Sequence, residues 1–548
     1  MFFRVTRTGG YAYIQIAESY RDGKKVRQRI LATLGRADIL QSTGQMERLL
    51  RSGMRFADRL AVIDAHAKGK TEPVSIHKIG PDLVFGRLWE EMGIQRILRG
   101  LLGNRRYGFD VERAIYLTVL RRLFASGSDR AAENWRDEYR IAGAEGLELH
   151  HLYRAMAFLG EAIPKEPETL GSPRCIKDLI EESLFERRRD LFTEVDLVFF
   201  DTTSIYFEGA GGETIGQYGY SKDHRPDLKQ MVVGFALDAE GCPLCCEMWP
   251  GNTTDVKTLI PLVDRMRRRF RIREVCVVAD RGMISDDTIT ALESAQPPVR
   301  YILGVRMRRQ NEVSEKILRH RGAWQEIQPE RTRAKDPQPL KLKDLEIGTR
   351  RYVVCLNEEQ RRKDAHDRAA IVEALKKQLK SGDKSLVGNK GYRKFLAQEG
   401  EGRFTIDEAK IKEDARFDGK WVLRTNTDYD AEIVARAYKS LLTVESLIRT
   451  TKSILVTRPI YHKCDETIRG HVFCSFLAIL LKTELESRMS QMDLASEWGE
   501  VIRGLNALQE VKAVFNGHHF LLRSQLTGDS HKAIRAAGVA VPPTIKEL

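Results

Sequence analysis

Two short apolar runs, each ending at an aspartate, constrain the fold of this chain more than any other feature. The run from Leu197 to Phe200 leads into Asp201, and the run from Val275 to Ala279 leads into Asp280. Such continuous apolar runs predict strands buried on both faces, and an acidic residue marks the point where each strand leaves the core. An aspartate in that position often only begins a turn or caps a helix, so a metal site needs a further carboxylate.

The further carboxylate is Glu445, in an amphipathic segment with apolar residues at helical spacing from 433 to 448. We predict one helix of about seven turns that begins near residue 430 and stops at Arg458-Pro459. Taken alone, Glu445 could simply pair with Arg449 one turn later. The residues that share the Glu445 face of this helix are Tyr438, Leu441 and Lys452.

These carboxylates and their surroundings resemble the catalytic signature of insertion-sequence transposases of the DDE, RNase H-like class. The insertion-sequence-four branch of that family marks its glutamate by Tyr, two residues, Arg, three residues, Glu, six residues, Lys. Tyr438, Glu445 and Lys452 fall on this pattern, and Leu441 stands where the family usually has Arg. Further blocks of the pattern follow in order at residues 201–203, 219–227, 250–255, 280–283 and 458–462. The resemblance covers about residues 195 to 480, and the N-terminal third more loosely.

The resemblance implies an α/β fold: an RNase H-like mixed-sheet catalytic core, a β-rich insertion before the catalytic Glu, and a mainly helical N-terminal region. The expected segments are a basic β-hairpin (1–40), a helical DNA-binding region (41–190), the first part of the core (191–305), a strand-rich insertion (306–427), the core helix with the catalytic Glu (428–485) and a C-terminal helical region (486–548).

Hydrophobic periodicity and turn residues predict the individual elements. Strands are expected at 11–16, 26–30, 230–238, 243–249, 301–305, 350–356 and 404–411, with a tight hairpin at 416–424. Helices are expected at 46–67, 81–102, 110–125, 129–140, 255–270 and 358–380.

The chemistry of DNA cleavage and joining explains why carboxylates are needed. Two Mg²⁺ ions about 3.5–4 Å apart can activate an oxygen nucleophile and stabilise a leaving oxygen. Magnesium prefers oxygen ligands, and Mn²⁺ could replace it. By the family resemblance, Asp201 bridges both ions, and Asp280 and Glu445 each bind one.

Several residues are candidate DNA contacts. Lys452 could bind a phosphate or be an ordinary exposed lysine, and Tyr438 could position DNA or orient a neighbour. Arg449 could supply the phosphate fork that Leu441 lacks.

Two basic segments are further candidates for DNA binding. Lys222 and Arg225 lie in a loop that could guide a DNA strand or be a solvated turn. Arg27 and Arg29 share one face of a predicted strand, which could lie on phosphates or face solvent.

Composition agrees with a nucleic-acid partner. The formal net charge is +13 and the pI is about 9.2, values that suit a polyanion. No run of about 18 apolar residues or signal peptide is evident, so we expect a soluble cytoplasmic protein, associated with the bacterial nucleoid. The close cysteines Cys242, Cys245 and Cys246 lack a second ligand pair for zinc, and we expect packed, reduced thiols. His462 and His471 are expected to be buried and hydrogen-bonded rather than metal ligands.

The sequence therefore predicts a cut-and-paste transposase that binds inverted terminal repeats and target DNA as a homodimer. The alternative is a DNA-binding protein of transposase ancestry that is catalytically inactive or only a nuclease. The three carboxylates favour the enzyme, and Leu441 favours the inactive binder.

Overall fold

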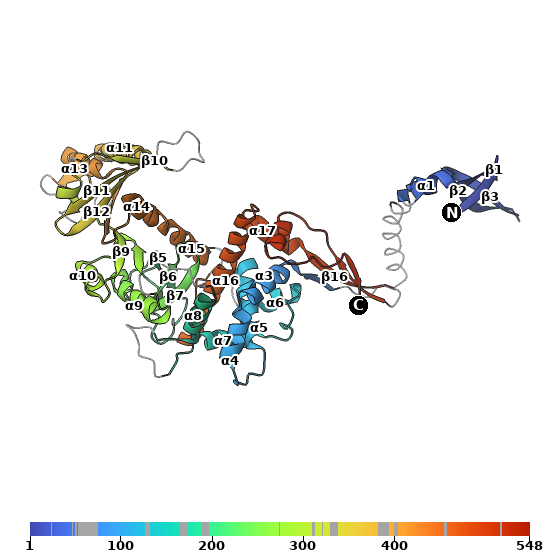
Figure 1. Cartoon of the computed structure of the whole chain (residues 1–548), viewed down its shortest axis with the longest axis horizontal. Coiled ribbons are helices and arrows are strands. Elements are labelled where there is room, and N and C mark those ends of the chain that lie inside the picture. Colours follow the sequence, from blue (N-terminus) through green and yellow to red (C-terminus); the bar gives the residue numbers. More distant parts are fainter. Residues whose placement is uncertain are drawn as a thin grey trace. The chain divides into compact units, whose positions relative to one another are not determined.

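The computed structural model describes residues 1–548 except 24, 47, 50–51, 53–74, 126–131, 165–172, 189–196, 273–274, 309–312, 321, 329–337, 382–393, 399–403, 454–456 and 516–517 (Figure 1). Its contacts divide the chain into two compact units. Unit 1 comprises Met1–His77, Gln509–Gln525 and Pro542–Leu548, and unit 2 comprises Lys78–Leu508 and Leu526–Val541.

Unit 1 contains two sheets. The predicted hairpin around Asp22-Gly23 is confirmed, and an additional first strand makes it three-stranded, in the order β1-β2-β3. The second sheet has the order β18-β17-β16-β4. The region predicted to be C-terminal and helical (486–548) therefore also contains the strands β16, β17 and β18. The elements are β1 (Phe2–Thr8), β2 (Tyr11–Asp22), β3 (Lys25–Arg36), α1 (Ala37–Ser42), β4 (Ser75–Lys78), β16 (Gln509–Phe515), β17 (His518–Arg523) and β18 (Ile545–Glu547). The helix predicted at 46–67 lies mostly outside the described residues.

The first part of unit 2 is helical, as predicted. The expected helix 81–102 is divided in two, because Gly93 adopts a left-handed conformation (φ 78°) that ends one helix and begins the next. The long α16, buried over most of its length, packs against α7 and α5. The helices are α3 (Gly80–Glu91), α4 (Ile94–Leu102), α5 (Val111–Phe124), α6 (Ala132–Glu138), α7 (Leu149–Gly160), α8 (Ile176–Arg188), α16 (Asp465–Gln491), α17 (Trp498–Ala507) and α18 (Ser530–Ala536).

A nine-stranded mixed sheet forms the centre of unit 2, in the order β10-β11-β12-β15-β9-β8-β5-β6-β7. β5, β8 and β9 are parallel neighbours, and the other neighbouring pairs are antiparallel. The predicted insertion therefore extends the core sheet through β15 rather than forming a separate one. The elements are β5 (Leu197–Tyr206), β6 (Gln230–Leu237), β7 (Pro243–Pro250), η2 (Asp255–Lys257), α9 (Leu259–Arg269), β8 (Cys276–Ala279), η3 (Arg281–Met283), α10 (Asp286–Ser294), β9 (Arg300–Gly304), a π-helix at Val313–Ile317, β10 (Gln325–Gln328), β11 (Leu340–Ile347), β12 (Arg350–Leu356) and β15 (Lys420–Thr425).

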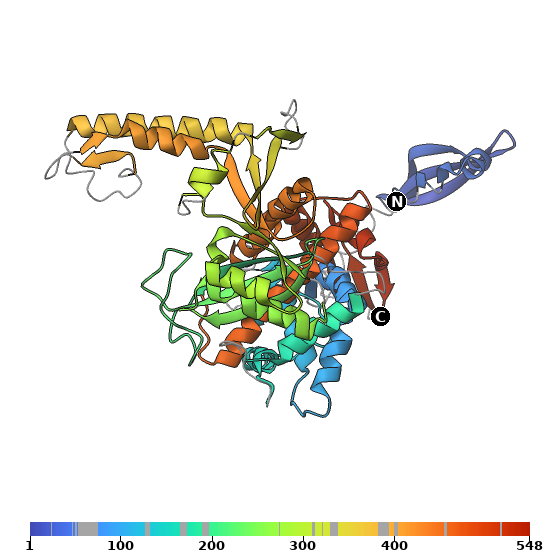
Figure 2. The same cartoon turned by 60° about the vertical axis from the view of Figure 1, so that its left-hand side comes forward.

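An arm projects from this sheet (Figure 2). It is built around a small apolar core of Leu375, Phe395 and Leu396. The charged helix predicted at 358–380 is confirmed as α11. The elements of the arm are α11 (Glu358–Ser381), β13 (Leu396–Gln398), β14 (Phe404–Ile406), α13 (Glu408–Asp414) and η6 (Ala415–Phe417).

Two predictions in this region were wrong. The strand expected at 404–411 stops at Ile406, because Asp407 caps α13 by accepting a hydrogen bond from the Lys410 backbone N–H (3.1 Å). The hairpin expected at 416–424 is a 3₁₀ turn followed by β15. Its turn residue Asp418 is held by Arg368 of α11, and β15 pairs with β12 and β9 instead.

The long helix predicted around Glu445 is two consecutive helices, α14 (Ala431–Lys439) and α15 (Leu441–Ser453). They meet at Ser440, whose hydroxyl donates to the Arg436 carbonyl oxygen (3.2 Å). Its backbone N–H is shared between the Arg436 and Ala437 carbonyls (both 3.1 Å). A serine that bonds back to the preceding turn in this way bends a helix, which the apolar pattern does not reveal.

Candidate active site

The register of two parallel strands brings the first two aspartates together. The β5–β8 pairing ends with Phe200 opposite Ala279, so Asp201 and Asp280 are the next residues on adjacent strands. β5 does not end at Asp201, as the apolar run suggested, because it continues to Tyr206 in antiparallel pairing with β6. The two aspartates therefore lie directly after the last parallel pair of β5 and β8.

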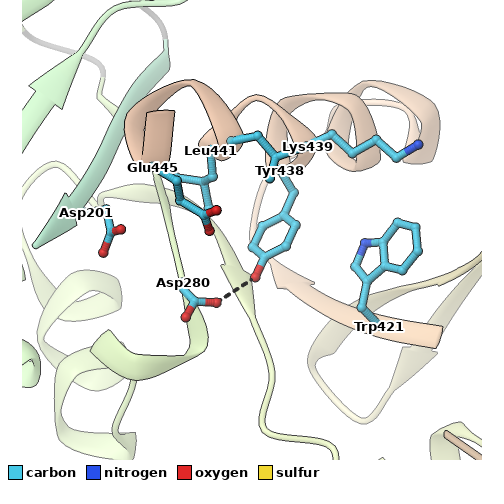
Figure 3. A pocket seen from close by; sticks show the side chains of 8 residues that line it. Asp201, Asp280, Trp421, Tyr438, Lys439, Leu441 and Glu445 are labelled. Carbon is cyan, nitrogen blue, oxygen red and sulfur yellow. Dashed lines mark hydrogen bonds between the residues drawn. The ribbon is translucent and has the colours of Figure 1, made fainter. Parts of the chain in front are cut away.

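The third carboxylate reaches the same place from α15. Figure 3 shows Glu445 pointing from the helix toward Asp280, with Asp201 on the neighbouring strand. All three line one pocket of about 180 Å³. Its other lining residues are Trp421, Tyr438, Lys439, Leu441 and Leu442.

Tyr438 holds the second aspartate in the pocket. Its hydroxyl donates to Asp280 Oδ1 (2.9 Å), as Figure 3 shows. Burial, followed by the nearby Asp280 charge, raises the pKa of Tyr438, so the phenol keeps its proton and remains a donor. Gly304, the last residue of β9, makes room for this ring, because a Cβ there would lie 2.2 Å from the Tyr438 hydroxyl. The signature tyrosine therefore orients a carboxylate.

The turn after Asp280 has its own support. The Arg306 guanidinium donates to the carbonyl oxygens of Arg281 (2.9 Å) and Gly282 (3.1 Å). Sequence reasoning missed this role, because an arginine after a strand carries no signal of its partner.

The electrostatics of Asp201 favour a bound cation. Burial raises the pKa of its carboxyl to about 6, against the opposing effects of Lys222 and the Thr202 backbone N–H. The negative charges of Asp280 and Asp255 raise it further. A divalent cation between the carboxylates would neutralise this repulsion.

The chemistry of the side chains suits such a cation, because Asp201, Asp280 and Glu445 are all carboxylates that line one pocket. As the side chains stand, no three His, Cys, Asp or Glu residues of the described part of the chain are close enough to hold one metal ion. Binding would therefore need the carboxylates to move together, and Glu445, exposed on its helix, is the one with room to move.

Two residues predicted to contact DNA form ion pairs inside unit 2. The Lys452 ammonium donates to Asp223 Oδ1 (2.7 Å), and Lys222 pairs with Asp255 Oδ2 (3.0 Å). Asp255 begins η2, and its Oδ1 also accepts a hydrogen bond from the hydroxyl of Thr202 (2.7 Å), the residue after Asp201.

The other predicted DNA contacts lie at the surface. Arg225 forms an exposed pair with Asp227, and Arg449 is exposed on α15. In unit 1, Arg27 and Arg29 lie on β3 with about two-thirds of their side chains exposed, beside Asp22 and Glu18. All four remain predicted DNA contacts.

Leu441 is only 6 % exposed and belongs to the main apolar core while lining the pocket. An arginine at this position would need a different environment. The apolar packing around position 441 therefore fits a leucine side chain.

His471 is buried, as predicted, whereas His462 is only partly buried. His462 Nε2 lies 3.0 Å from His471 Nδ1, and His471 packs against Arg122. None of the eight cysteines forms a disulfide, and burial raises the pKa of the Cys242 and Cys245 thiols to about 12.

Within the described residues, none of the helices combines the length and apolar character that a bilayer span requires.

Comparison with known proteins gives two family matches. The model of the transposase DDE domain matches residues 194–481, and the model of the N-terminal domain of IS1634 family transposases matches residues 3–67. No curated protein matches the chain.

Among solved structures, similarity is found to a cryo-EM structure of the piggyBac transposase synaptic complex with hairpin DNA, at 10 % identity and a TM-score of 0.36, covering 78 % of each chain. A crystal structure of the Mos1 mariner paired-end complex with Mn is similar at 13 % identity and a TM-score of 0.14. That match covers 39 % of this chain and 66 % of that one.

Proposed function

Since this chain belongs to the DDE transposases, and is an insertion-sequence transposase that cleaves and joins DNA with the help of metal ions, we propose that Asp201, Asp280 and Glu445 are its catalytic carboxylates. The observation that carries the proposal is the convergence of β5, the end of β8 and α15 on one pocket. No other residue type lining that pocket offers an anionic oxygen at neutral pH.

We propose that this core is RNase H-like. The order β7-β6-β5-β8-β9, with two antiparallel pairs followed by two parallel pairs, supports it. The carboxylates come from the central strand, its parallel neighbour and the helix after the insertion. Tyr438, Glu445 and Lys452 support placement in the insertion-sequence-four type.

The three carboxylates would hold two Mg²⁺ or Mn²⁺ ions, with Asp201 shared between them. Such ions activate the attacking oxygen and stabilise the leaving oxygen of the phosphodiester. The chain's own contribution is placement: the sheet register fixes Asp201 beside Asp280, and the Tyr438 hydroxyl holds Asp280 in one orientation. Glu445 completes the set from the helix.

The DNA partners would be the inverted terminal repeats of the element and a target site, bound by a homodimer in a cut-and-paste reaction. The net charge of +13 supports binding to a polyanion. The exposed arginines of β3 and Arg449 of α15 are the proposed phosphate contacts. A bacterial protein of this function would work at the nucleoid.

The test uses a plasmid carrying this gene with its native flanking DNA, incubated with the protein and Mg²⁺. The wild type should cut at the flanking repeats and give joined products, and Glu445→Gln should do neither. Glu432→Gln is the matched control, because Glu432 pairs with Arg436 on the exposed side of α14 and should leave cleavage unchanged.

Two other outcomes would contradict the proposal. Bound but uncut DNA with the wild type would favour the inactive binder. Cut DNA without joined products would favour a nuclease.

A further inference from the structure

A short loop segment between β5 and β6, residues 221–223, contacts both β5, which carries Asp201, and α15, which carries Glu445. We call Ser221, Lys222 and Asp223 the clasp. Its two charged residues are adjacent in sequence but bind partners on different elements. Neither contact was expected from the basic character of the loop.

Lys222 holds the β5 side. Its ammonium donates to the carbonyl oxygen (2.8 Å) and the hydroxyl (2.9 Å) of Thr202, the residue after Asp201. It also pairs with Asp255 Oδ2 (3.0 Å), while its backbone N–H donates to Ser204 Oγ (2.8 Å). Lys222 is therefore fixed to the strand that carries the first catalytic aspartate.

Asp223 holds the α15 side. Its side chain is 5 % exposed, and its Oδ1 accepts from Lys452 (2.7 Å) and pairs with Arg458. Lys452 lies seven residues after Glu445, about two turns along the same helical face. Because a buried carboxylate is costly without its counter-charges, Asp223 needs these cations to stay in place.

We infer that Lys222 and Asp223 are positioning residues that fix α15, with Glu445, against β5, with Asp201. This inference rests on the proposed catalytic role of those two carboxylates. The signature lysine then acts through Asp223 in the free protein and not as a direct contact to a DNA phosphate. Arg225 and Asp227, later in the same loop, form an exposed ion pair with each other.

The loop supplies a matched pair of variants. Asp223→Asn removes the charge that binds Lys452 while keeping the shape of the side chain, and Asp227→Asn does the same for a surface pair. Binding to a terminal-repeat duplex, plasmid cleavage and the Mg²⁺ concentration that half-saturates the rise in melting temperature should be measured for both.

For Asp223→Asn we expect unchanged duplex binding, cleavage slower by about 10- to 100-fold and a higher half-saturating Mg²⁺ concentration. Asp223→Glu should restore part of the cleavage. Asp227→Asn should match the wild type throughout. The clasp is wrong if Asp223→Asn also matches the wild type in cleavage and Mg²⁺ demand.

A double-mutant cycle separates the clasp from a direct phosphate contact. If Lys452 and Asp223 act as a pair, Lys452→Met and the double variant should both cleave as slowly as Asp223→Asn. The rate losses of the two single variants should then not multiply in the double variant. If Lys452→Met weakens duplex binding and the two effects multiply, Lys452 binds the phosphate itself and the inference fails.

Two further results keep these conclusions separate. If Asp223→Asn does not fold, Lys222→Gln breaks the clasp from the β5 side and is judged by the same two outcomes. If the wild type itself does not cleave, the proposed function fails, whereas a cleaving wild type with an equal Asp223→Asn overturns only the clasp.

Discussion

The buried charges between α8, β7 and α9 compensate one another, whereas the carboxylates beside β5 do not. In the first region, which we call the ionic cluster, three cations and three carboxylates are at most 8 % exposed and pair with each other. In the active-site pocket, three carboxylates line one cavity, and the lining ammonium, that of Lys439, lies over the Trp421 ring (5.9 Å) rather than against them. The members of the ionic cluster are Lys177, Arg265, Arg269, Asp178, Glu181 and Glu247.

We interpret this difference as one between charges that stabilise the fold and charges that are proposed to bind a metal ion. In the ionic cluster, burial opposes ionisation of Asp178, but Lys177 and Arg269 outweigh it and keep the pKa of Asp178 below its usual value, whereas burial outweighs Lys177 at Glu181 and raises the pKa of that carboxyl. In the pocket, burial and neighbouring carboxylates raise the pKa of Asp201. In the ionic cluster, the compensating cations are side chains of the chain itself. In the pocket, under the proposed function, a bound metal ion would supply the positive charge.

Removing a cation should therefore have its largest effect in the ionic cluster. Lys177→Met leaves Asp178 and Glu181 buried with less compensation, and the free energy of unfolding should fall by about 3–5 kcal/mol. Lys439→Met in the pocket should cost only about 0.5–1 kcal/mol, the value of its contact with Trp421. Denaturant unfolding measures both, and equal losses would contradict the comparison.

Adding a metal cation should stabilise the protein through the pocket and not through the ionic cluster. Mg²⁺ at a hundred times its dissociation constant should raise the stability of the wild type by about 2.7 kcal/mol. Asp201→Asn should lose this gain, while Asp178→Asn, although less stable, should keep it. Thermal unfolding with and without Mg²⁺ tests this, and a gain retained in Asp201→Asn would place the ion elsewhere.

Loss of the contacts that orient Asp280 should have a smaller effect, confined to the rate of cleavage. Tyr438→Phe removes the donor to Asp280, and Gly304→Ala displaces the ring. Because residues that orient metal ligands typically contribute 10- to 100-fold, plasmid cleavage should slow by about that factor in each variant. Cleavage at the wild-type rate in both would show that Asp280 needs no such support.

The apolar sequence pattern predicted the scaffold of the pocket well. The runs before Asp201 and Asp280 are long enough to indicate buried strands, and the structure contains both as β5 and β8. Glu445 was found because its spacing to Tyr438 and Lys452 is specific.

The sequence could not reveal contacts between side chains far apart along the chain. Lys222 and Lys452 looked like free cations, yet their partners Asp255 and Asp223 lie 33 and 229 positions away. The bend at Ser440 depends on one hydroxyl that bonds backward, which leaves the apolar periodicity unchanged.

The smallest expected effect is the acid sensitivity of the ionic cluster. Because the folded-state pKa of Asp178 is lowered, its contribution to stability is present above the ordinary value of 3.8 and is lost as the pH falls below it. Denaturation midpoints should decline less steeply below this pH in Asp178→Asn than in the wild type. Parallel declines would show that Asp178 is not stabilised by its partners.

The central claim, that β5, the turn after β8 and α15 together bind the catalytic cations, is tested most directly by anomalous diffraction from crystals grown with Mn²⁺. The account predicts anomalous peaks in the pocket contacted by Asp201, Asp280 and Glu445, and none there in Asp201→Asn. Ordered Mn²⁺ at another site with an empty pocket, or a pocket peak that survives in Asp201→Asn, would contradict it.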